Sequence, residues 1–239
     1  MDNALLHGLN LLGVFVFALT GALAASRRQL DIVGFAFLAA VTGVGGGTLR
    51  DVILGSTPVF WIAEPVYAAL CVATAVATYF LAPFVEYRYR LLLWADAVGI
   101  SGYCVMGAAR GLDAGASPFG AVVMGVITAT FGGIIRDIIA GEPSVLLRKE
   151  VYVTATVVGA GLFVAGAEMG MPFWPAALLG AFSAFFVRAG ALAYGWTLPS
   201  YRPRPGRDFP PGQSVFDRSG GPAGDKPCPD AERGPPPLA

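Results

Sequence analysis

Charged residues in this sequence are grouped in clusters, and the long apolar stretches between them restrict the folds open to the chain. Seven stretches approach the roughly 20 residues that a helix needs to cross the hydrocarbon core of a membrane. None alternates in polarity as a barrel strand does, and a helix satisfies its own backbone hydrogen bonds in lipid. The pattern predicts an all-α membrane protein with seven transmembrane helices. The stretches lie at about 4–26, 32–49, 66–85, 91–109, 118–135, 151–167 and 174–193.

The composition agrees with a membrane location for most of the chain. Hydrophobic residues make up 55% and charged residues 13%, whereas soluble domains are about a quarter charged. The first stretch follows Asp2 rather than a basic segment and is too long for the apolar core of a signal peptide, so we expect a retained span. Residues 199–239 hold eleven of the 18 prolines and eleven of the 32 charges, which predicts a disordered tail.

The distribution of basic residues predicts the orientation, because cytoplasmic loops collect Lys and Arg. With Arg50 and Arg136 set aside as intramembrane, the opposite loops hold Arg110 alone. This asymmetry predicts a multi-pass inner (plasma) membrane protein with its N-terminus outside and its C-terminus in the cytoplasm. The cytoplasmic set comprises the loops after spans one, three and five, the end of span seven and the start of the tail: Arg27, Arg28, Arg88, Arg90, Arg148, Lys149, Arg188, Arg202, Arg204 and Arg207.

The sequence contains an internal duplication. The segment that begins at Thr42 and ends in Arg50-Asp51 recurs from Thr128 to Arg136-Asp137, at a constant offset (128 − 42 = 86). Each copy carries three spans, an odd number, so the second copy enters the membrane from the opposite side and the repeat is inverted. We therefore expect a first repeat at 1–87, a second at 88–170, a seventh helix at 171–198 and a cytoplasmic tail at 199–239.

Glycine is concentrated in the second span of each repeat, at Gly45, Gly46 and Gly47 and again at Gly132 and Gly133. Each glycine in a helix costs roughly 1 kcal/mol relative to alanine. We expect a kink or an unwound turn at these positions, where the helix lines a cavity at the repeat interface. The alternative is that the glycines only let two helices approach closely.

Charged side chains inside spans are the other candidates for a site. A charge near mid-membrane costs about 2.5–3.5 kcal/mol, so such residues pair or face water. Arg50 with Asp51, and Arg136 with Asp137, would approach a pathway from opposite sides; alternatively, they cap helix ends or bridge to neighbouring helices. Asp96, whose repeat partner is Asn10, lies either near the cytoplasmic interface or at a pore mouth, where it attracts cations.

The sequence contains no pattern of residues that indicates an enzyme active site or a metal site. The three cysteines are dispersed, and the single histidine, His7, is near the outer end of the first span, where a structural role is expected. We expect no catalytic residues, no metal, no cofactor and no nucleic-acid partner.

The doubled Gly-Gly-x-x-Arg-Asp motif, at 46–51 and 132–137, with spans in a three-plus-three-plus-one order, resembles the prokaryotic branch of the trimeric intracellular cation (TRIC) channel family over about residues 4–195. The resemblance implies a homotrimer in which each subunit has a potassium-permeable pore, lined by kinked second and fifth spans.

Two features depart from the animal members of that family. Their Lys-Glu-Val segment, associated with phosphoinositides, lies near the fourth span, whereas Lys149-Glu150-Val151 follows the fifth span here. Arg148 and Lys149 would still meet anionic lipid at about 1 kcal/mol each, unless they are ordinary loop charges. The fourth span has only Arg110 at its outer end, which argues against strong voltage sensing by that span.

These features favour a passive monovalent-cation channel. One alternative is a secondary transporter of a small solute such as glycine, because bacterial proteins with this kind of repeat have been assigned that activity. A third hypothesis is a membrane assembly scaffold that uses the tail.

Overall fold

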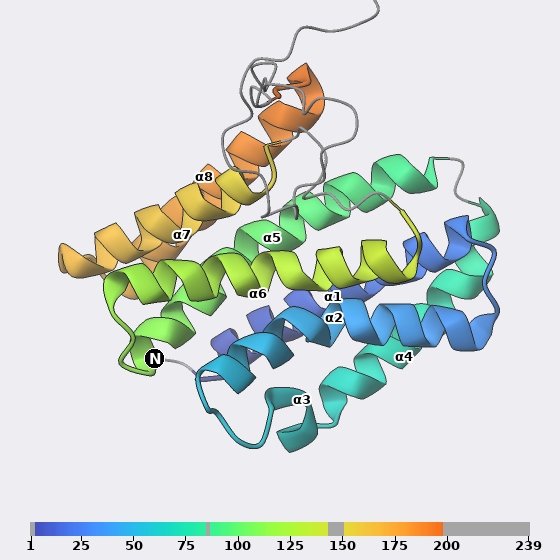
Figure 1. Cartoon of the computed structure of the whole chain (residues 1–239), viewed down its shortest axis with the longest axis horizontal. Coiled ribbons are helices and arrows are strands. Elements are labelled where there is room, and N and C mark those ends of the chain that lie inside the picture. The colour runs from blue at the N-terminus through green and yellow to red at the C-terminus, as the bar shows by residue number, and fades with distance from the viewer. Residues whose placement is uncertain (1–2, 85–86, 143–150, 198–239) are drawn as a thin grey trace, which may run out of the picture. The chain divides into compact units, whose positions relative to one another are not determined.

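The computed structural model describes residues 3–84, 87–142 and 151–197, and these residues fold mainly as α-helices (Figure 1). The predicted tail at 199–239 lies outside the described residues. Every apolar stretch predicted to be a span contains a helix of at least 16 residues, so the all-α membrane fold is confirmed. The helices are α1 (Asn3–Arg27), α2 (Ile32–Ile53), α3 (Phe60–Ala63), α4 (Val66–Leu81), α5 (Arg88–Asp113), α6 (Pro118–Ile139), α7 (Val153–Glu168) and α8 (Phe173–Tyr194).

Six of these helices are long and apolar enough to cross a membrane, namely α1, α2, α4 with the 3-10 turn that follows it, α5, α6 and α8. The apolar helix α7 has 16 residues. At 1.5 Å per residue it is about 24 Å long, a few ångströms less than a typical hydrocarbon core. The sequence did not predict α3, a single turn between α2 and α4 (Figure 1).

The duplicated sequence produces matching helices. Both α2 and α6 have 22 residues. The Asp31 carboxylate accepts a hydrogen bond from the Gly34 amide at 2.7 Å, and the repeat-related Ser117 hydroxyl accepts one from the Gly120 amide at 3.2 Å. Asp and Ser are favoured at this position because they satisfy an otherwise unpaired amide of the first helical turn. Both α2 and α6 therefore begin with an N-cap side chain at the same position of the repeat.

The two glycine runs bring α2 and α6 into backbone contact. A Cβ placed on Gly46 would collide with the carbonyl oxygen of Thr128. The repeat-related contact is also too close for a side chain, because a Cβ on Gly132 would lie 2.5 Å from the carbonyl oxygen of Thr42. These contacts are related by the same offset as the sequence repeat, so Gly46 and Gly132 let the two helices approach closely.

The expected unwound turn is absent from α2 and α6, both of which are continuous helices through their glycines. A physical reason is that backbone groups released from a helix within the membrane need new partners. The glycines are instead used for helix contact. A bend that keeps the helix intact stays a prediction.

The central helices are α1 and α5, which are the most buried of the six long helices. The first packs against α2, α4 and α5, and the second against α1, α6, α7 and α8. Because α2 also packs against α6, the four helices α1, α2, α5 and α6 enclose the repeat interface. Any pathway between the two repeats must run among them.

Gly46→Ala and Gly132→Ala should each destabilise the protein by about 1–3 kcal/mol, because the added methyl group collides with the backbone of the facing helix. The free energy of unfolding in mixed micelles measures this. The matched control is Gly161→Ala in α7, where a Cβ meets nothing within 4 Å, so helix propensity should stabilise it by about 0.5–1 kcal/mol. Equal effects at all three sites would show that the crossing is not tightly packed.

Candidate functional site

Arg50 and Asp51 form a buried ion pair at the end of α2. The Arg50 Nε atom donates to Asp51 Oδ1 at 2.8 Å, and Arg50 Nη2 lies 2.7 Å from the same oxygen. The other carboxylate oxygen of Asp51 accepts a hydrogen bond at 3.0 Å from the amide of Phe60, the first residue of α3. A cation in the last turn of a helix is also favoured by the helix dipole. The pair therefore ends α2 and anchors α3.

The Arg50–Asp51 pair faces a polar cavity of about 420 Å³, which we call the Arg50 cavity. Side chains of both charges line it, and Asn10 and Tyr67 contribute neutral polar groups. Such a lining is compatible with water and small ions. The full lining is Asn10, Arg50, Asp51, Leu54, Ser56, Pro58, Phe60, Ala63, Glu64, Tyr67, Arg110, Asp113 and Ala114.

His7 contacts two residues that line this cavity, Glu64 and Tyr67. Its Nδ1 atom lies 3.2 Å from the Glu64 carboxylate and 3.3 Å from the Tyr67 hydroxyl. Tyr67 in turn accepts a hydrogen bond at 3.3 Å from the side-chain amide of Asn10. The histidine thus has polar partners from α4 and from the segment just before it, which agrees with the structural role expected for it.

The second Arg-Asp pair is fully enclosed. Arg136 has no exposed surface, and its Nε atom donates to Asp137 Oδ1 at 2.9 Å. Its Nη1 atom donates to Asp96 Oδ1 at 2.8 Å and to the Thr20 hydroxyl at 3.0 Å. We call these four residues the Arg136 cluster. The cluster joins α6 to α5 and α1, so the prediction that this pair bridges to neighbouring helices is confirmed.

Asp96 is only 1% exposed, so it does not line an open pore mouth in this structure. The other expectation, a position near the cytoplasmic interface, stays a prediction. Charge neutralisation explains the burial. A buried carboxylate needs a cation and hydrogen bonds to offset its lost hydration, and Arg136 supplies them. Its repeat partner Asn10, which is uncharged, lines the Arg50 cavity instead.

A second layer of polar contacts closes the protein near the Arg136 cluster. Arg27 Nη1 lies 2.9 Å from Glu142 Oε2, and Arg28 donates to the carbonyl oxygen of Gly141. The Arg27 guanidinium also lies 4.4 Å from the centre of the Tyr89 ring. These contacts join the end of α1 to the end of α6 and the start of α5.

The repeat-related positions are arranged differently at the opposite end. Asp113, Ala114 and Ser56, which correspond to Arg27, Arg28 and Glu142, all line the Arg50 cavity. Two ends built from equivalent positions are thus hollow in one case and closed by ion pairs in the other. The side chains at a few positions produce this asymmetry within a symmetric framework.

Arg188 is an interior residue that the sequence interpretation misplaced. We expected it among the cytoplasmic basic residues, but it lies within α8 with no exposed surface. Its guanidinium lies 5.1 Å from the centre of the Tyr152 ring. Its position inside a predicted span was a signal of burial, because a charge there must find partners in the bundle. Arg148 and Lys149 lie outside the described residues.

The fold and these two sites define a multi-pass membrane protein built on an internal repeat. The sequence matches the family model described as "Glycine transporter" at residues 7–83 and 93–168, two segments that start one repeat apart. The chain therefore belongs to this family, and its resemblance to prokaryotic TRIC channels is confirmed by the comparisons below.

Curated relatives carry names that state only a membrane location. A UPF0126 membrane protein of Vibrio cholerae is 38% identical, with 84% of each chain covered. The UPF0126 inner membrane protein YadS of Escherichia coli is 36% identical, with 82% of this chain and 96% of that protein covered.

Solved structures of TRIC channels have the same fold. The TRIC trimeric intracellular cation channel orthologue from Rhodobacter sphaeroides is 50% identical, with a TM-score of 0.79, and covers 81% of this chain and 100% of its own. A structure described under conductance through TRIC cation channels is 26% identical, with a TM-score of 0.76, and covers 85% of this chain and 99% of its own.

Asp96→Ala should destabilise the protein by about 3–5 kcal/mol, because it leaves a buried guanidinium with too little compensating charge. Asn10→Ala is the control at the repeat-related position, where loss of a neutral hydrogen bond should cost about 1 kcal/mol. Chemical unfolding in mixed micelles measures both free energies. Equal losses would contradict a structural role for the Arg136 cluster.

Proposed function

We propose that this protein is a potassium-permeable cation channel of the inner membrane, with one pore in each subunit of a homotrimer. The observation that carries the proposal is the 50% identity to the Rhodobacter sphaeroides TRIC channel orthologue over the whole of that chain. The polar Arg50 cavity, which is lined by residues of both repeats, supports it. The N-terminus is outside in this proposal, so the Arg50 cavity opens outward and the Arg136 cluster faces the cytoplasm.

The charges of the Arg50 cavity are suited to a cation entrance. Asp51 neutralises Arg50 through a direct ion pair. Glu64 and Asp113 add two carboxylates to the lining against the remaining guanidinium of Arg110. A mouth with excess negative charge raises the local concentration of cations. In this proposal the polar side chains of the cavity replace part of the hydration shell of an ion. An unwound helix would have used its freed backbone carbonyls for the same purpose.

Within this proposal, the glycines of α2 and α6 control the width of the pore. Gly46 and Gly132 hold the two helices in contact, and a Cβ on Gly45 would have only ordinary contacts with Ile135 and Gly132, at 3.7 and 3.8 Å. Helices that meet through such small residues can slide or bend without rearranging large side chains. Gly47 and Gly133 extend the same flexible segment.

Two further parts of the proposal concern the surroundings of the channel. Arg148 and Lys149 follow the fifth span on the cytoplasmic side and would bind anionic lipid headgroups. The relative named as an inner membrane protein, YadS of Escherichia coli, supports the location.

A secondary transporter of glycine is the alternative, favoured by the description of the matching family model. The Arg50 cavity holds guanidinium groups that attract a carboxylate and carboxylates that attract an ammonium group. Saturable uptake distinguishes this activity from conduction, which gives unitary currents.

Purified trimers in planar bilayers should show unitary currents that reverse near the potassium equilibrium potential in a potassium chloride gradient. Cross-linking of the same sample should give three subunits per particle. Silent bilayers, together with saturable glycine uptake into proteoliposomes, would contradict the channel proposal and support the transporter.

The double variant Glu64→Gln, Asp113→Asn should lower the permeability of potassium relative to chloride, because it removes two carboxylates from the cavity lining. Reversal potentials in asymmetric potassium chloride measure the ratio. Glu168→Gln, at an exposed carboxylate outside the cavity lining, is the control and should leave the ratio unchanged. An unaltered ratio in the double variant would place the cation entrance elsewhere.

A further inference from the structure

A layer of apolar side chains separates the Arg50 cavity from the Arg136 cluster along α1. Asn10 lines the cavity, and Thr20 belongs to the Arg136 cluster, where its hydroxyl accepts a hydrogen bond from Arg136. Phe17 lies between them in sequence, two turns after Asn10 and about one turn before Thr20. Its side chain is only 3% exposed.

The same order is found along α5 in the opposite direction. Asp96 belongs to the Arg136 cluster, and Arg110 lines the Arg50 cavity. Tyr103 is midway, seven residues from each, and a seven-residue spacing keeps all three on one face of a helix. Tyr103 is 4% exposed. Each central helix thus carries one buried aromatic residue between the two polar ends.

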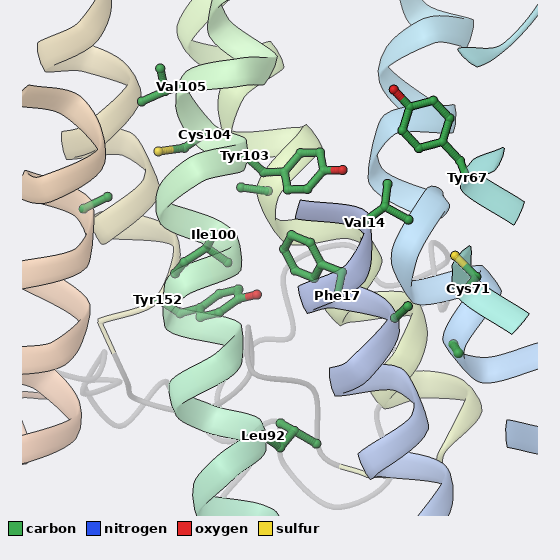
Figure 2. Packing of buried hydrophobic residues seen from close by; sticks show 14 of the residues in the cluster. Val14, Phe17, Tyr67, Cys71, Leu92, Ile100, Tyr103, Cys104, Val105 and Tyr152 are labelled. Carbon is green, nitrogen blue, oxygen red and sulfur yellow. The ribbon is translucent and has the colours of Figure 1, made fainter. Parts of the chain in front are cut away.

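These two aromatic residues touch each other at the centre of the repeat interface. Their ring centres are 5.2 Å apart, with the planes tilted by 59°. Figure 2 shows Phe17 on α1 and Tyr103 on α5 with their rings side by side. The Tyr103 hydroxyl donates to the carbonyl oxygen of Asn10 at 3.3 Å, so the ring lies directly beneath a residue that lines the cavity.

A pair of repeat-related glycines makes room for the two rings. A Cβ on Gly13 would collide with the Tyr103 ring, and a Cβ on the repeat-related Gly99 would lie 3.1 Å from the Phe17 ring. Phe17 and Tyr103 are themselves related by the repeat offset, as are Val14 and Ile100, both fully buried in the same layer. The layer therefore lies on the pseudo-two-fold axis, through which a pathway shared by both repeats must pass.

We propose that Phe17 and Tyr103 form the constriction that limits ion flux between the two polar ends. The inference rests on the proposed channel function. An apolar constriction excludes water, and an ion that loses its hydration there meets a barrier. The two rings block the middle of the pathway. The Arg136 cluster and the Arg27–Glu142 pair close its cytoplasmic end.

The structure also provides space for the constriction to open. Tyr103, Gly13 and Gly99 border an apolar cavity of about 230 Å³, which is also lined by residues of α1 and α8. Rotation of the Tyr103 side chain into this cavity would break its hydrogen bond to Asn10 and move the phenol out of the layer.

The test compares Phe17→Ala, Tyr103→Ala and the double variant with wild-type trimers in planar bilayers. Each truncation should raise the mean potassium current per trimer, and the double variant should raise it about tenfold, equivalent to about 1.4 kcal/mol removed from the barrier. The control is Phe163→Ala in α7, which removes a ring that is 2% exposed and whose centre lies 5.8 Å from that of Phe173 in α8. It should leave the current unchanged.

A second measurement does not depend on conduction. Thr20→Cys is introduced into a chain whose three cysteines, Cys71, Cys104 and Cys228, are replaced by alanine, and a membrane-impermeant thiol reagent is added on the side of the Arg50 cavity. Labelling should be slow with Phe17 present and faster by about tenfold with Phe17→Ala, if the same barrier of about 1.4 kcal/mol is removed. Phe17→Leu, a milder truncation, should give an intermediate rate and serves if the alanine variant does not fold.

The outcomes separate the two proposals. If wild type conducts but the currents and labelling rates of the Phe17 and Tyr103 variants equal those of Phe163→Ala, the constriction lies elsewhere and the inference is wrong. If wild type gives no unitary currents, the channel proposal fails, and unchanged labelling of Thr20→Cys then also overturns the barrier. Faster labelling of the Phe17→Ala variant in a protein that does not conduct would still support a barrier at Phe17, but in the pathway of a transporter.

Discussion

The backbone contact between α2 and α6 is the constraint on which the rest of the structure depends. Gly46 meets the Thr128 carbonyl and Gly132 meets the Thr42 carbonyl, so the two repeats are locked together by equivalent contacts. With that crossing fixed, α1 and α5 are brought together at their centres, where Phe17 meets Tyr103. The polar sites at the ends of α2 and α6 then lie on opposite sides of this central layer.

Residue differences between the two repeats make the two ends of the protein unlike each other. Asn10 and Asp96 occupy equivalent positions, but only the carboxylate forms an ion pair with the facing arginine, Arg136. At the next layer, Arg27 pairs with Glu142, whereas the equivalent Asp113 and Ser56 line a cavity. A few substitutions between copies therefore decide which end admits water, while the helix crossings stay nearly symmetric.

Much of this fold could be predicted from the sequence, because apolar length, charge clusters and a constant repeat offset are visible without tertiary information. The function of the glycines was harder to predict, since a glycine run weakens a helix and also permits close packing, and only the position of Thr128 decides between them. The burial of Asp96 and Arg188 was missed because their partners, Arg136 and Tyr152, come from distant parts of the chain. Pairing across helices cannot be deduced from hydropathy alone.

The central claim is that equivalent positions at the two ends of one pathway differ in access to water. Leu54, which lines the Arg50 cavity, and its repeat equivalent Ala140, which is 7% exposed, are matched positions for cysteine substitution. The rate of modification by a membrane-impermeant thiol reagent, applied from each side in reconstituted vesicles, measures access directly. We predict rapid modification of Leu54→Cys from one side only and protection of Ala140→Cys from both sides. Equal rates at the two positions would contradict the account.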